Sequence, residues 1–393
     1  MSRKSILFVM NTMNIGGIQR SLIELLKAVS GRYDTTLYCV DAVGPLLEEI
    51  PENTKLIRGS AYAGIPEMSF QEIRKRSAAL APLRLLFAFL ARNGMKKLAV
   101  RLYLLFFRKI PGSYDIAVSF SQPIDDRSFC KLSNEIVLSG CRAKKKITFL
   151  HCDFEKYEGN TAYNRSLYQR FDKIVPVSDS VGQVFMRCTG ISPDRVRTVY
   201  NICDAASVRE RSAQDALQYN GFSFVVIARL GREKGLERVI SCAERLNREG
   251  FTFEVHLVGG GPLETQLRET IRQKELEGIV FMHGEQNNPY RFMRNAGCLL
   301  VPSYHEAFPM IFLEAIALSL PVLTTDTLSA KEIIRQYECG AVCENTEEGI
   351  LAGMRDALAN GIRISRDPEK ELLLSRGKRQ FDELVEELTE DVH

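Results

Sequence analysis

Residues 5–30 read SILFVMNTMNIGGIQRSLIELLKAVS, and this stretch decides the fold of the first part of the chain. It opens with a continuous apolar run that ends in polar residues, which is typical of a strand buried on both faces of a parallel sheet. Beyond a turn at Gly16 and Gly17, apolar residues recur at helical spacing: Ile18, Leu22, Leu25, Leu26 and Val29. Strand, glycine turn and helix form a βα unit, which predicts a doubly wound α/β domain.

The same alternation continues along the chain and then restarts. Short buried runs predict further strands of the first domain at 35–40, 114–120, 145–151, 173–178 and 196–201. A polar, weakly periodic stretch precedes a second series of strands, expected at 222–230, 253–261, 279–284, 297–303 and 321–325. Helical patterns separate them at about 235–249, 262–276 and 312–319. We therefore expect a first domain at 1–203, a linker at 204–220, a second domain at 221–365, and a helical segment at 366–393 that packs on the first domain.

Composition and charge restrict the class of protein. With 393 residues, 45% of them hydrophobic and 26% charged, the chain matches an ordinary globular protein. Its ten cysteines form no C-x-x-C pair, which indicates reduced thiols in a reducing, cytoplasmic compartment. The first apolar run is shorter than the core of a signal peptide. Residues 1–200 hold 30 Lys and Arg against 18 Asp and Glu, a net charge of +12, which favours an anionic partner such as a membrane surface or nucleic acid.

The basic charge concentrates in one window. Between Glu72 and Asp115 there are ten Lys and Arg and no acid. Within it, residues 83–109 mix long apolar side chains with seven cations: Arg84, Arg92, Lys96, Lys97, Arg101, Arg108 and Lys109. Charges interrupt the segment too often for a transmembrane span. The pattern predicts a basic amphipathic surface for an anionic membrane, and the alternative is a pair of core helices with solvated basic faces.

Candidate anion-binding residues follow two of the predicted strands. Gly16 and Gly17 let backbone N–H groups approach an anion at a helix start. Neither G-x-G-x-x-G nor a P-loop occurs, so no nicotinamide cofactor or P-loop nucleotide is supported. Arg229 and Lys234, five apart on a strand-to-helix turn, suit a diphosphate, and the alternative is a solvated basic loop. Gly259 ends the next strand with room for close backbone approach.

Two carboxylates follow a later strand. In SYHEAFPMIFLEAIALSLPVLTT, residues 303–325, we place Glu306 in a loop and Glu314 in the first turn of a helix that begins near Ile311. A carboxylate in a first turn is commonly a partner of the helix dipole. Taken together, the two side chains can accept hydrogen bonds from the hydroxyls of one ligand, while N–H groups at the helix start donate to a phosphate.

These motifs together resemble the glycosyltransferases of retaining family 4. The resemblance rests on Arg229 and Lys234, on PSYHEAFPMIFLEAIA, on GGIQRSLIEL, and on FLHCD at 149–153 and VRTVYNICD at 196–204. It covers essentially residues 5–360 and is best with enzymes of bacterial capsule, exopolysaccharide or lipopolysaccharide synthesis. It implies the GT-B fold, two facing Rossmann-like domains with a central cleft. The family's glycines are replaced by Ala307 and Ser319, and its Gly-rich turn by residues 327–332.

The resemblance also implies roles for individual residues. The chain would move a hexose or N-acetylhexosamine from a UDP-sugar to a lipid-linked glycan acceptor. Arg229 and Lys234 would hold the diphosphate, Glu314 the ribose, and Glu306 the transferred sugar. His151 would join Glu306 and the two cations as a catalytic residue. The remaining donor-binding residues would be Gly16, Gly17, Gly259, His283, Phe308, Pro309, Met310 and Ile311.

Cofactors and competing functions complete the expectation. No D-x-D occurs, so we predict no metal and no other cofactor, with retention by front-face attack assisted by the leaving phosphate. The protein would lie on the inner face of the cytoplasmic membrane and bind no nucleic acid. The alternatives are a UDP-sugar epimerase or a pyridoxal-dependent phosphorylase on the same fold, and a non-enzymatic two-domain sugar-binding protein.

Overall fold

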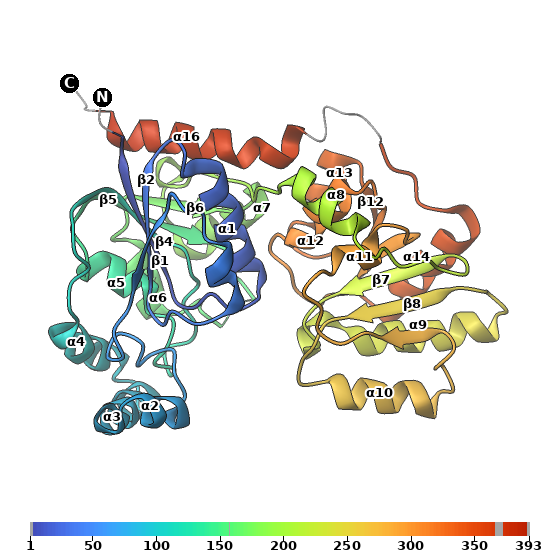
Figure 1. The fold of residues 1–393 in the computed structure, drawn as a ribbon, viewed down its shortest axis with the longest axis horizontal. Coiled ribbons are helices and arrows are strands. Elements are labelled where there is room, and N and C mark those ends of the chain that lie inside the picture. The colour runs from blue at the N-terminus through green and yellow to red at the C-terminus, as the bar shows by residue number, and fades with distance from the viewer. Residues whose placement is uncertain (1–2, 157, 366–371, 391–393) are drawn as a thin grey trace. The chain divides into compact units, whose positions relative to one another are not determined.

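A computed structural model describes residues 3–156, 158–365 and 372–390 (Figure 1). The chain forms two compact units: unit 1 is Met1–Ile202 with Gly377–His393, and unit 2 is Cys203–Arg376. Each unit has a six-stranded parallel sheet, in the order β3-β2-β1-β4-β5-β6 in unit 1 and β12-β11-β10-β7-β8-β9 in unit 2. Read from the opposite edge, the second order repeats the first, and both are the order of a Rossmann fold. The predicted fold class of two Rossmann-like domains is confirmed.

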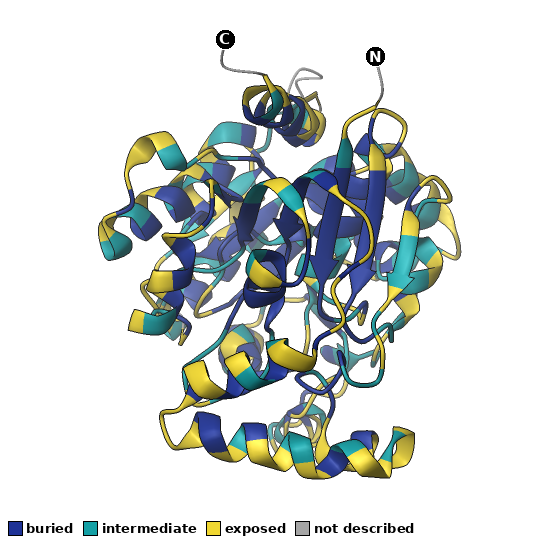
Figure 2. Ribbon diagram, turned by 90° about the vertical axis from the view of Figure 1, so that its left-hand side faces the viewer, coloured by how far each residue is buried: buried dark blue, intermediate teal, exposed yellow. Residues whose placement is uncertain are grey.

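The strands are short and parallel throughout. Those of unit 1 are β1 Ser5–Met10, β2 Asp34–Cys39, β3 Lys55–Arg58, β4 Tyr114–Ser119, β5 Ala143–Leu150 and β6 Lys173–Pro176. Those of unit 2 are β7 Ser223–Ile227, β8 Glu254–Val258, β9 Val280–Met282, β10 Cys298–Val301, β11 Val322–Thr325 and β12 Gly340–Cys343. Figure 2 shows buried strands flanked by helices whose outer faces are exposed.

The helices connect the strands and cover both faces of each sheet. Those of unit 1 are α1 Gly17–Val29, α2 Phe70–Arg76, α3 Ala81–Arg92, α4 Lys96–Phe106, α5 Ser133–Ser139, α6 Ala162–Tyr168 and α7 Asp179–Thr189. Those of unit 2 are α8 Ala205–Ala213, α9 Leu236–Arg248, α10 Glu264–Gln273, α11 Tyr290–Met293, α12 Met310–Ala317, α13 Ala330–Tyr337 and α14 Glu347–Asn360. The last helix is α16 Arg376–Thr389.

Helix α16 packs on the sheet of unit 1. Phe381 is fully buried and stacks on Phe8 of β1, with 6.1 Å between ring centroids. Beside it, Asp382 accepts hydrogen bonds from Arg32 and from the Tyr33 hydroxyl, both at 2.8 Å. Residues 366–371 and 391–393 of the expected terminal segment lie outside the described residues.

The predicted strand at 196–201 is wrong. Only Val196 pairs with a strand, through an isolated bridge to Ile174. Conversely, the edge strands β3 and β12 were not predicted. Their sequences, KLIR and GAVC, are partly exposed and lack the long apolar run of a central strand.

The expected linker at 204–220 contains helix α8. The Asp204 side chain caps it by accepting a hydrogen bond from the Ser207 N–H at 3.1 Å. Val208 and Ser212 are buried, and the helix packs on α11 and α12 of unit 2. Its sequence, AASVRERSA, is too polar to give a helical stripe, so its partners within the unit decide its structure.

None of the ten cysteines forms a disulfide in the described structure, and six of them are buried. Among the described residues, no helix combines the length and the apolar character needed to cross a bilayer.

Candidate active site

The candidate residues of unit 2 gather at one edge of its sheet. Arg229 follows β7, Gly259 follows β8, His283 follows β9 and Glu306 follows β10. Because the strands are parallel, their carboxyl ends meet at the same edge, where ligands of doubly wound sheets bind.

Lys234 and Glu306 contact each other directly. The Lys234 ammonium lies 2.5 Å from Glu306 Oε1, and only 24% and 15% of the two side chains are exposed. The Ser303 hydroxyl donates to the same oxygen at 2.8 Å, and Ser303 is buried. The two donors hold the Glu306 carboxylate beside the ammonium group. A ligand that binds here would therefore meet a cation and a hydrogen-bond acceptor next to each other.

The loops that carry this pair are joined by further bonds. The Tyr304 N–H donates to the Glu233 carbonyl at 2.9 Å. The buried Arg238 donates to the Pro302 carbonyl and to Asn345 Oδ1, and its guanidinium lies 3.8 Å from the centroid of the Tyr304 ring. Arg238, a residue of α9, therefore holds the β10–α12 loop in position. No motif or spacing in the sequence indicates this role, because Arg238 occupies an ordinary helix position.

Glu314 lies in the second turn of α12, not in the first as predicted. The helix begins at Met310, directly after Pro309 at the N-cap, so Glu314 is its fifth residue. Its side chain is buried and accepts a hydrogen bond from the Tyr290 hydroxyl at 3.1 Å. Arg211 of α8 lies over the Tyr290 ring at 4.8 Å from its centroid. Helix α8, which lies in the expected linker, thus contacts the tyrosine that donates to Glu314.

The segment before α12 is arranged for backbone contacts. Phe308 and Met310 are buried, while Pro309 and Ile311 are partly exposed. N–H groups in the first turn of a helix have no partner within the helix. The start of α12 therefore supplies donors close in sequence to Glu306.

Gly259 has a steric reason to be glycine. Its φ is +144°, and a Cβ atom there would lie 1.9 Å from the Ala228 carbonyl oxygen. The close approach joins the β7 and β8 loops, and it requires no ligand. Arg229, in the first of these loops, is exposed, and its guanidinium makes no hydrogen bond or ion pair within the described part of the chain. Its charge remains available to an anion.

His283 belongs to a partly buried chain of side chains. Its Nε2 lies 2.9 Å from His256 Nδ1, and His256 Nε2 lies 3.0 Å from a Glu254 oxygen. Burial, with smaller contributions from His256 and Arg291, lowers the pKa of His283 to about 4. The neutral imidazole is held by His256 rather than presented as a cation.

Unit 1 places Gly16, Gly17 and His151 after β1 and β5, at the carboxyl edge of its own sheet. A Cβ at Gly17 would meet no atom within 4 Å, and one at Gly16 would meet only the end of the Gln19 side chain. His151 packs against Phe120 and Phe149, with centroid distances of 4.7 and 5.8 Å. Its Nε2 is buried without a hydrogen-bond partner among the described residues, and burial lowers its pKa to about 3.

Comparison with known proteins adds a family to this geometry. Residues 207–371 match the family model "Glycosyl transferases group 1". The match covers 165 of the 393 residues and includes the loops that carry Arg229, Lys234 and Glu306. The expected resemblance to bacterial polysaccharide glycosyltransferases is confirmed.

Individual relatives are similar over part of their length. The chain is 27% identical over 194 residues to the N-acetylgalactosamine-N,N'-diacetylbacillosaminyl-diphospho-undecaprenol 4-alpha-N-acetylgalactosaminyltransferase of Campylobacter jejuni, covering 49% of this chain and 52% of that protein. It is 27% identical over 213 residues to the putative colanic acid biosynthesis glycosyltransferase WcaL of Salmonella typhimurium, covering 52% and 50%. The chain thus spans about half the length of these curated relatives.

The fold is similar over the whole chain. The crystal structure of Anabaena Alr3699/HepE in complex with UDP and glucose matches with a TM-score of 0.65 and 15% identity, covering 99% of this chain and 100% of that one. At this level of identity the match shows the fold, and it confirms the predicted GT-B class.

Proposed function

We propose that the protein is a retaining glycosyltransferase that moves a hexose or N-acetylhexosamine from a UDP-sugar to a lipid-linked glycan acceptor in surface-polysaccharide synthesis. One observation carries the proposal: a cation and a carboxylate, Lys234 and Glu306, are held 2.5 Å apart at the carboxyl edge of a sheet within the glycosyltransferase family region. The relatives named above act on, or are named for, polysaccharide and undecaprenol-diphosphate substrates.

The cations of unit 2 would bind the diphosphate of the donor. Arg229 offers a planar fork without a competing partner among described residues, and Lys234 offers a compact charge. N–H groups at the start of α12 add neutral donors. As the sugar leaves, negative charge accumulates on the diphosphate, and these groups stabilise it without a metal ion.

The carboxylates would bind hydroxyl groups. We assign Glu314 to the ribose. The Glu314 side chain is buried, and the hydrogen bond from the Tyr290 hydroxyl keeps its carboxylate in one orientation. We assign Glu306 to the transferred sugar. Lys234 and Ser303 both donate to its carboxylate, and Lys234 is also the cation that we assign to the diphosphate, so Glu306 would lie next to the sugar end of the diphosphate. Positive charge that develops on the anomeric carbon would be stabilised by this carboxylate.

In the reaction, the bond between the anomeric carbon and the diphosphate oxygen breaks while the acceptor oxygen bonds to the same face of that carbon. The acceptor proton passes to the leaving phosphate, and UDP departs. Among described residues, no cluster of three His, Cys, Asp or Glu side chains is arranged to hold a metal. We propose that the reaction requires neither a metal nor another cofactor.

We assign Gly16, Gly17 and His151 to substrate contacts made by unit 1. Since no atom of the described fold requires glycine at position 17, a ligand that approaches the α1 backbone explains the residue better than packing does. His151 is neutral at physiological pH because of its lowered pKa. It would therefore exchange hydrogen bonds with a sugar hydroxyl rather than pair with a phosphate.

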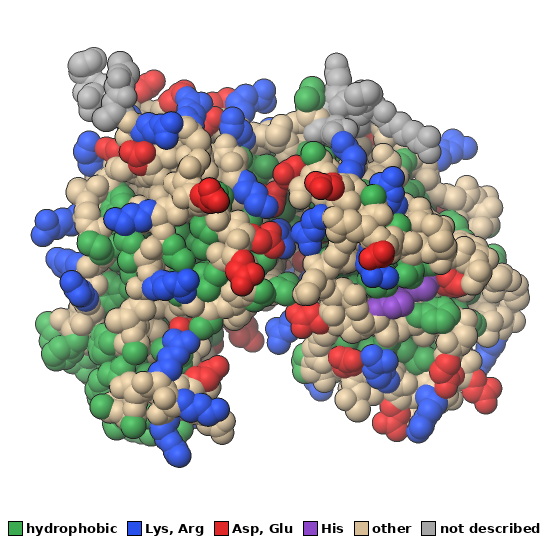
Figure 3. Space-filling model, viewed as in Figure 1, with side chains coloured by type: hydrophobic (Ala, Val, Ile, Leu, Met, Phe, Trp, Pro, Cys, Tyr) green, Lys and Arg blue, Asp and Glu red, His purple; other side chains and the backbone are tan. Residues whose placement is uncertain are grey.

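We also propose that α3 and α4 rest on an anionic membrane, on the cytoplasmic side. Several of their apolar side chains are exposed, including Leu85, Phe89, Leu105 and Phe106 at 54%, 61%, 73% and 71%. Figure 3 shows hydrophobic side chains gathered over these helices with Lys and Arg around them. Two of the seven cations serve the fold instead: Arg84 donates to the Met68 carbonyl and Lys96 to the Asp125 carbonyl.

Vesicle sedimentation tests this surface. Replacing Arg92, Arg108 and Lys109 by Glu reverses three exposed charges and should weaken binding to anionic vesicles at least tenfold, at about 1 kcal/mol per basic residue near the bilayer. Unchanged sedimentation would contradict the membrane assignment. A matched variant with Arg245, Arg248 and Arg268 of unit 2 replaced by Glu should leave vesicle binding unchanged.

Product analysis separates the competing functions. With UDP-sugars and a membrane extract as acceptor source, a transferase releases UDP, an epimerase interconverts the sugars, and a binding protein does neither. No feature of the described site favours the epimerase or the pyridoxal-dependent phosphorylase.

A further inference from the structure

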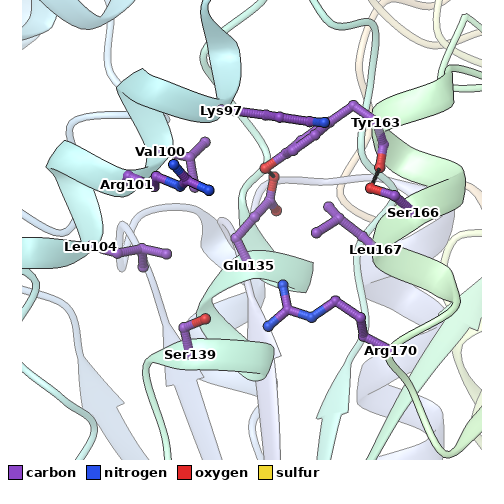
Figure 4. Close-up of a pocket in the computed structure, with 10 residues that line it drawn as sticks. All are labelled: Lys97, Val100, Arg101, Leu104, Glu135, Ser139, Tyr163, Ser166, Leu167 and Arg170. Atoms are coloured by element: carbon purple, nitrogen blue, oxygen red, sulfur yellow. Dashed lines mark hydrogen bonds between the residues drawn. The ribbon is translucent and has the colours of Figure 1, made fainter.

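Unit 1 contains a cavity of about 360 Å³ between α4, α5 and α6 (Figure 4). Three cations line it: Lys97 and Arg101 from α4, and Arg170 just after α6. Val100, Leu104 and Leu167 form its apolar part. The proposed transfer reaction uses none of these residues.

A buried carboxylate forms one wall of the cavity. Glu135, in the first turn of α5, is only 3% exposed. Its Oε1 accepts a hydrogen bond from the Tyr163 hydroxyl at 3.0 Å. Its Oε2 is buried and has no hydrogen-bond partner among the described residues. A buried acceptor without a partner is costly, so a ligand that donates a hydrogen bond here would be favoured.

The charge of the cavity selects an anion. Lys97, Arg101 and Arg170 form no ion pair with a described carboxylate. The buried ammonium of Lys96 also acts on Glu135. Three cations and one carboxylate line the cavity, which favours a ligand with net negative charge over a zwitterion. Arginine and lysine together with a single acceptor suit a phosphate group with a neighbouring hydroxyl.

The surface beside the cavity is apolar. Leu98, Leu105 and Phe106 are 45%, 73% and 71% exposed. Lys97, Arg101 and Leu104 recur at i, i+4 and i+7 along α4, so they share one face, and Leu98 and Leu105 lie on the adjacent face. A molecule with its phosphate in the cavity would therefore find an apolar surface for a hydrocarbon chain next to it.

We propose that this cavity binds the headgroup of an anionic glycerophospholipid of the phosphatidylglycerol class. The phosphodiester contacts Lys97, Arg101 and Arg170, and a headgroup hydroxyl donates to Glu135 Oε2. The acyl chains pass along Leu98, Leu105 and Phe106 into the bilayer. This specificity goes beyond the proposed glycosyl transfer and does not depend on it.

The test compares two lipids of equal charge. The full chain is titrated with nanodiscs of phosphatidylcholine that contain the same mole fraction of either phosphatidylglycerol or phosphatidylmethanol. Phosphatidylmethanol keeps the phosphodiester and its charge and lacks the headgroup hydroxyls. We expect phosphatidylglycerol to bind about tenfold more tightly, as for a charge-assisted hydrogen bond gained. Equal affinities would overturn the proposal, because a merely electrostatic surface does not distinguish the two lipids.

A charge-matched pair of variants locates the site. Arg170→Ala removes a cation of the cavity, whereas Arg165→Ala removes an exposed cation of α6 that does not line it. We expect R170A to reduce the ratio of the two affinities toward one. R165A should weaken both lipids alike and preserve the ratio. An unchanged ratio in R170A would overturn the assignment to this cavity.

A soluble headgroup distinguishes the possible sources of the ligand. Glycerophosphoglycerol, which has the same phosphodiester and hydroxyls without acyl chains, should bind at least tenfold more weakly than the phosphatidylglycerol nanodisc. If it binds as tightly, the cavity is a site for a soluble phosphodiester and the lipid proposal fails.

Discussion

The contact between Lys234 and Glu306 can be tested by a double-mutant cycle of Lys234→Met and Glu306→Gln. At 2.5 Å and an effective dielectric constant of about 20, the gross attraction of the two charges is about 7 kcal/mol. Desolvation of two largely buried groups offsets most of it. We therefore expect a coupling of about 1–3 kcal/mol in the free energy of unfolding, measured by urea denaturation.

Activity separates a structural pair from a donor-binding pair. If the two side chains grip the donor, each single variant should lower kcat/KM for UDP release about 100-fold or more, because each removes a group that contacts the reacting phosphate or sugar. The kcat/KM of the double variant should be no higher than that of the less active single variant. If the double variant instead recovers activity to within about tenfold of the wild type, the pair serves only the fold, and the reasoning is refuted.

Three further predictions concern glycine, histidine and metal ions. Gly17→Ala should leave the Tm within about 2 °C of wild type while lowering activity. Gly259→Ala should instead lower the free energy of unfolding by about 2 kcal/mol or more, because the new Cβ would overlap the Ala228 carbonyl. Thermal melts and UDP release distinguish the two variants. His151 has a folded pKa of about 3, below its usual 6.5, so its contribution to stability is present above pH 6.5 and is lost as the pH falls toward 3. His151→Gln should therefore reduce the slope of unfolding free energy against pH in that window by at most about 1.4 kcal/mol per pH unit, and an unchanged slope would contradict the burial of a neutral ring. EDTA should leave the rate of UDP release unchanged, and a loss restored by Mg²⁺ or Mn²⁺ would contradict the metal-free reaction.

The central strands of both sheets were predictable because burial on two faces leaves long apolar runs. Ser5–Met10 is such a run, and its residues from Ile6 onward are almost completely buried. The edge strands β3 and β12 carry no such signal: Lys55–Arg58 is half polar because one side of it faces solvent. Helix α8 also escaped prediction, since its polar sequence acquires its structure from α11 and α12.

The sequence indicated the candidate residues but not the contacts between them. Arg229, Lys234, Glu306 and Glu314 stand out in the sequence, and parallel topology brings their loops to one edge. The ion pair between Lys234 and Glu306 depends on how two loops 72 residues apart close on each other, which spacing does not reveal. A shift of one residue in the start of α12 moved Glu314 from the first turn to the second.

The residues that support the site could not be predicted either, because their roles also depend on contacts between separate elements. The Tyr290 hydroxyl orients Glu314 from a different helix, and Arg238 holds the β10–α12 loop from α9. In the same way, Lys96 belongs to the basic window by pattern, yet it is buried and donates to the Asp125 carbonyl. Charge counted along a sequence does not distinguish a solvated cation from one that serves the fold.

The most direct test of the proposed function is UDP release from a panel of UDP-glucose, UDP-galactose, UDP-N-acetylglucosamine and UDP-N-acetylgalactosamine, with a membrane extract as the source of acceptor. We predict that one of these donors gives acceptor-dependent release of UDP and that Glu306→Gln abolishes most of it. Interconversion of the sugars without release of UDP, or equal release by the Glu306→Gln variant, would contradict the assignment of a glycosyltransferase centred on Lys234 and Glu306.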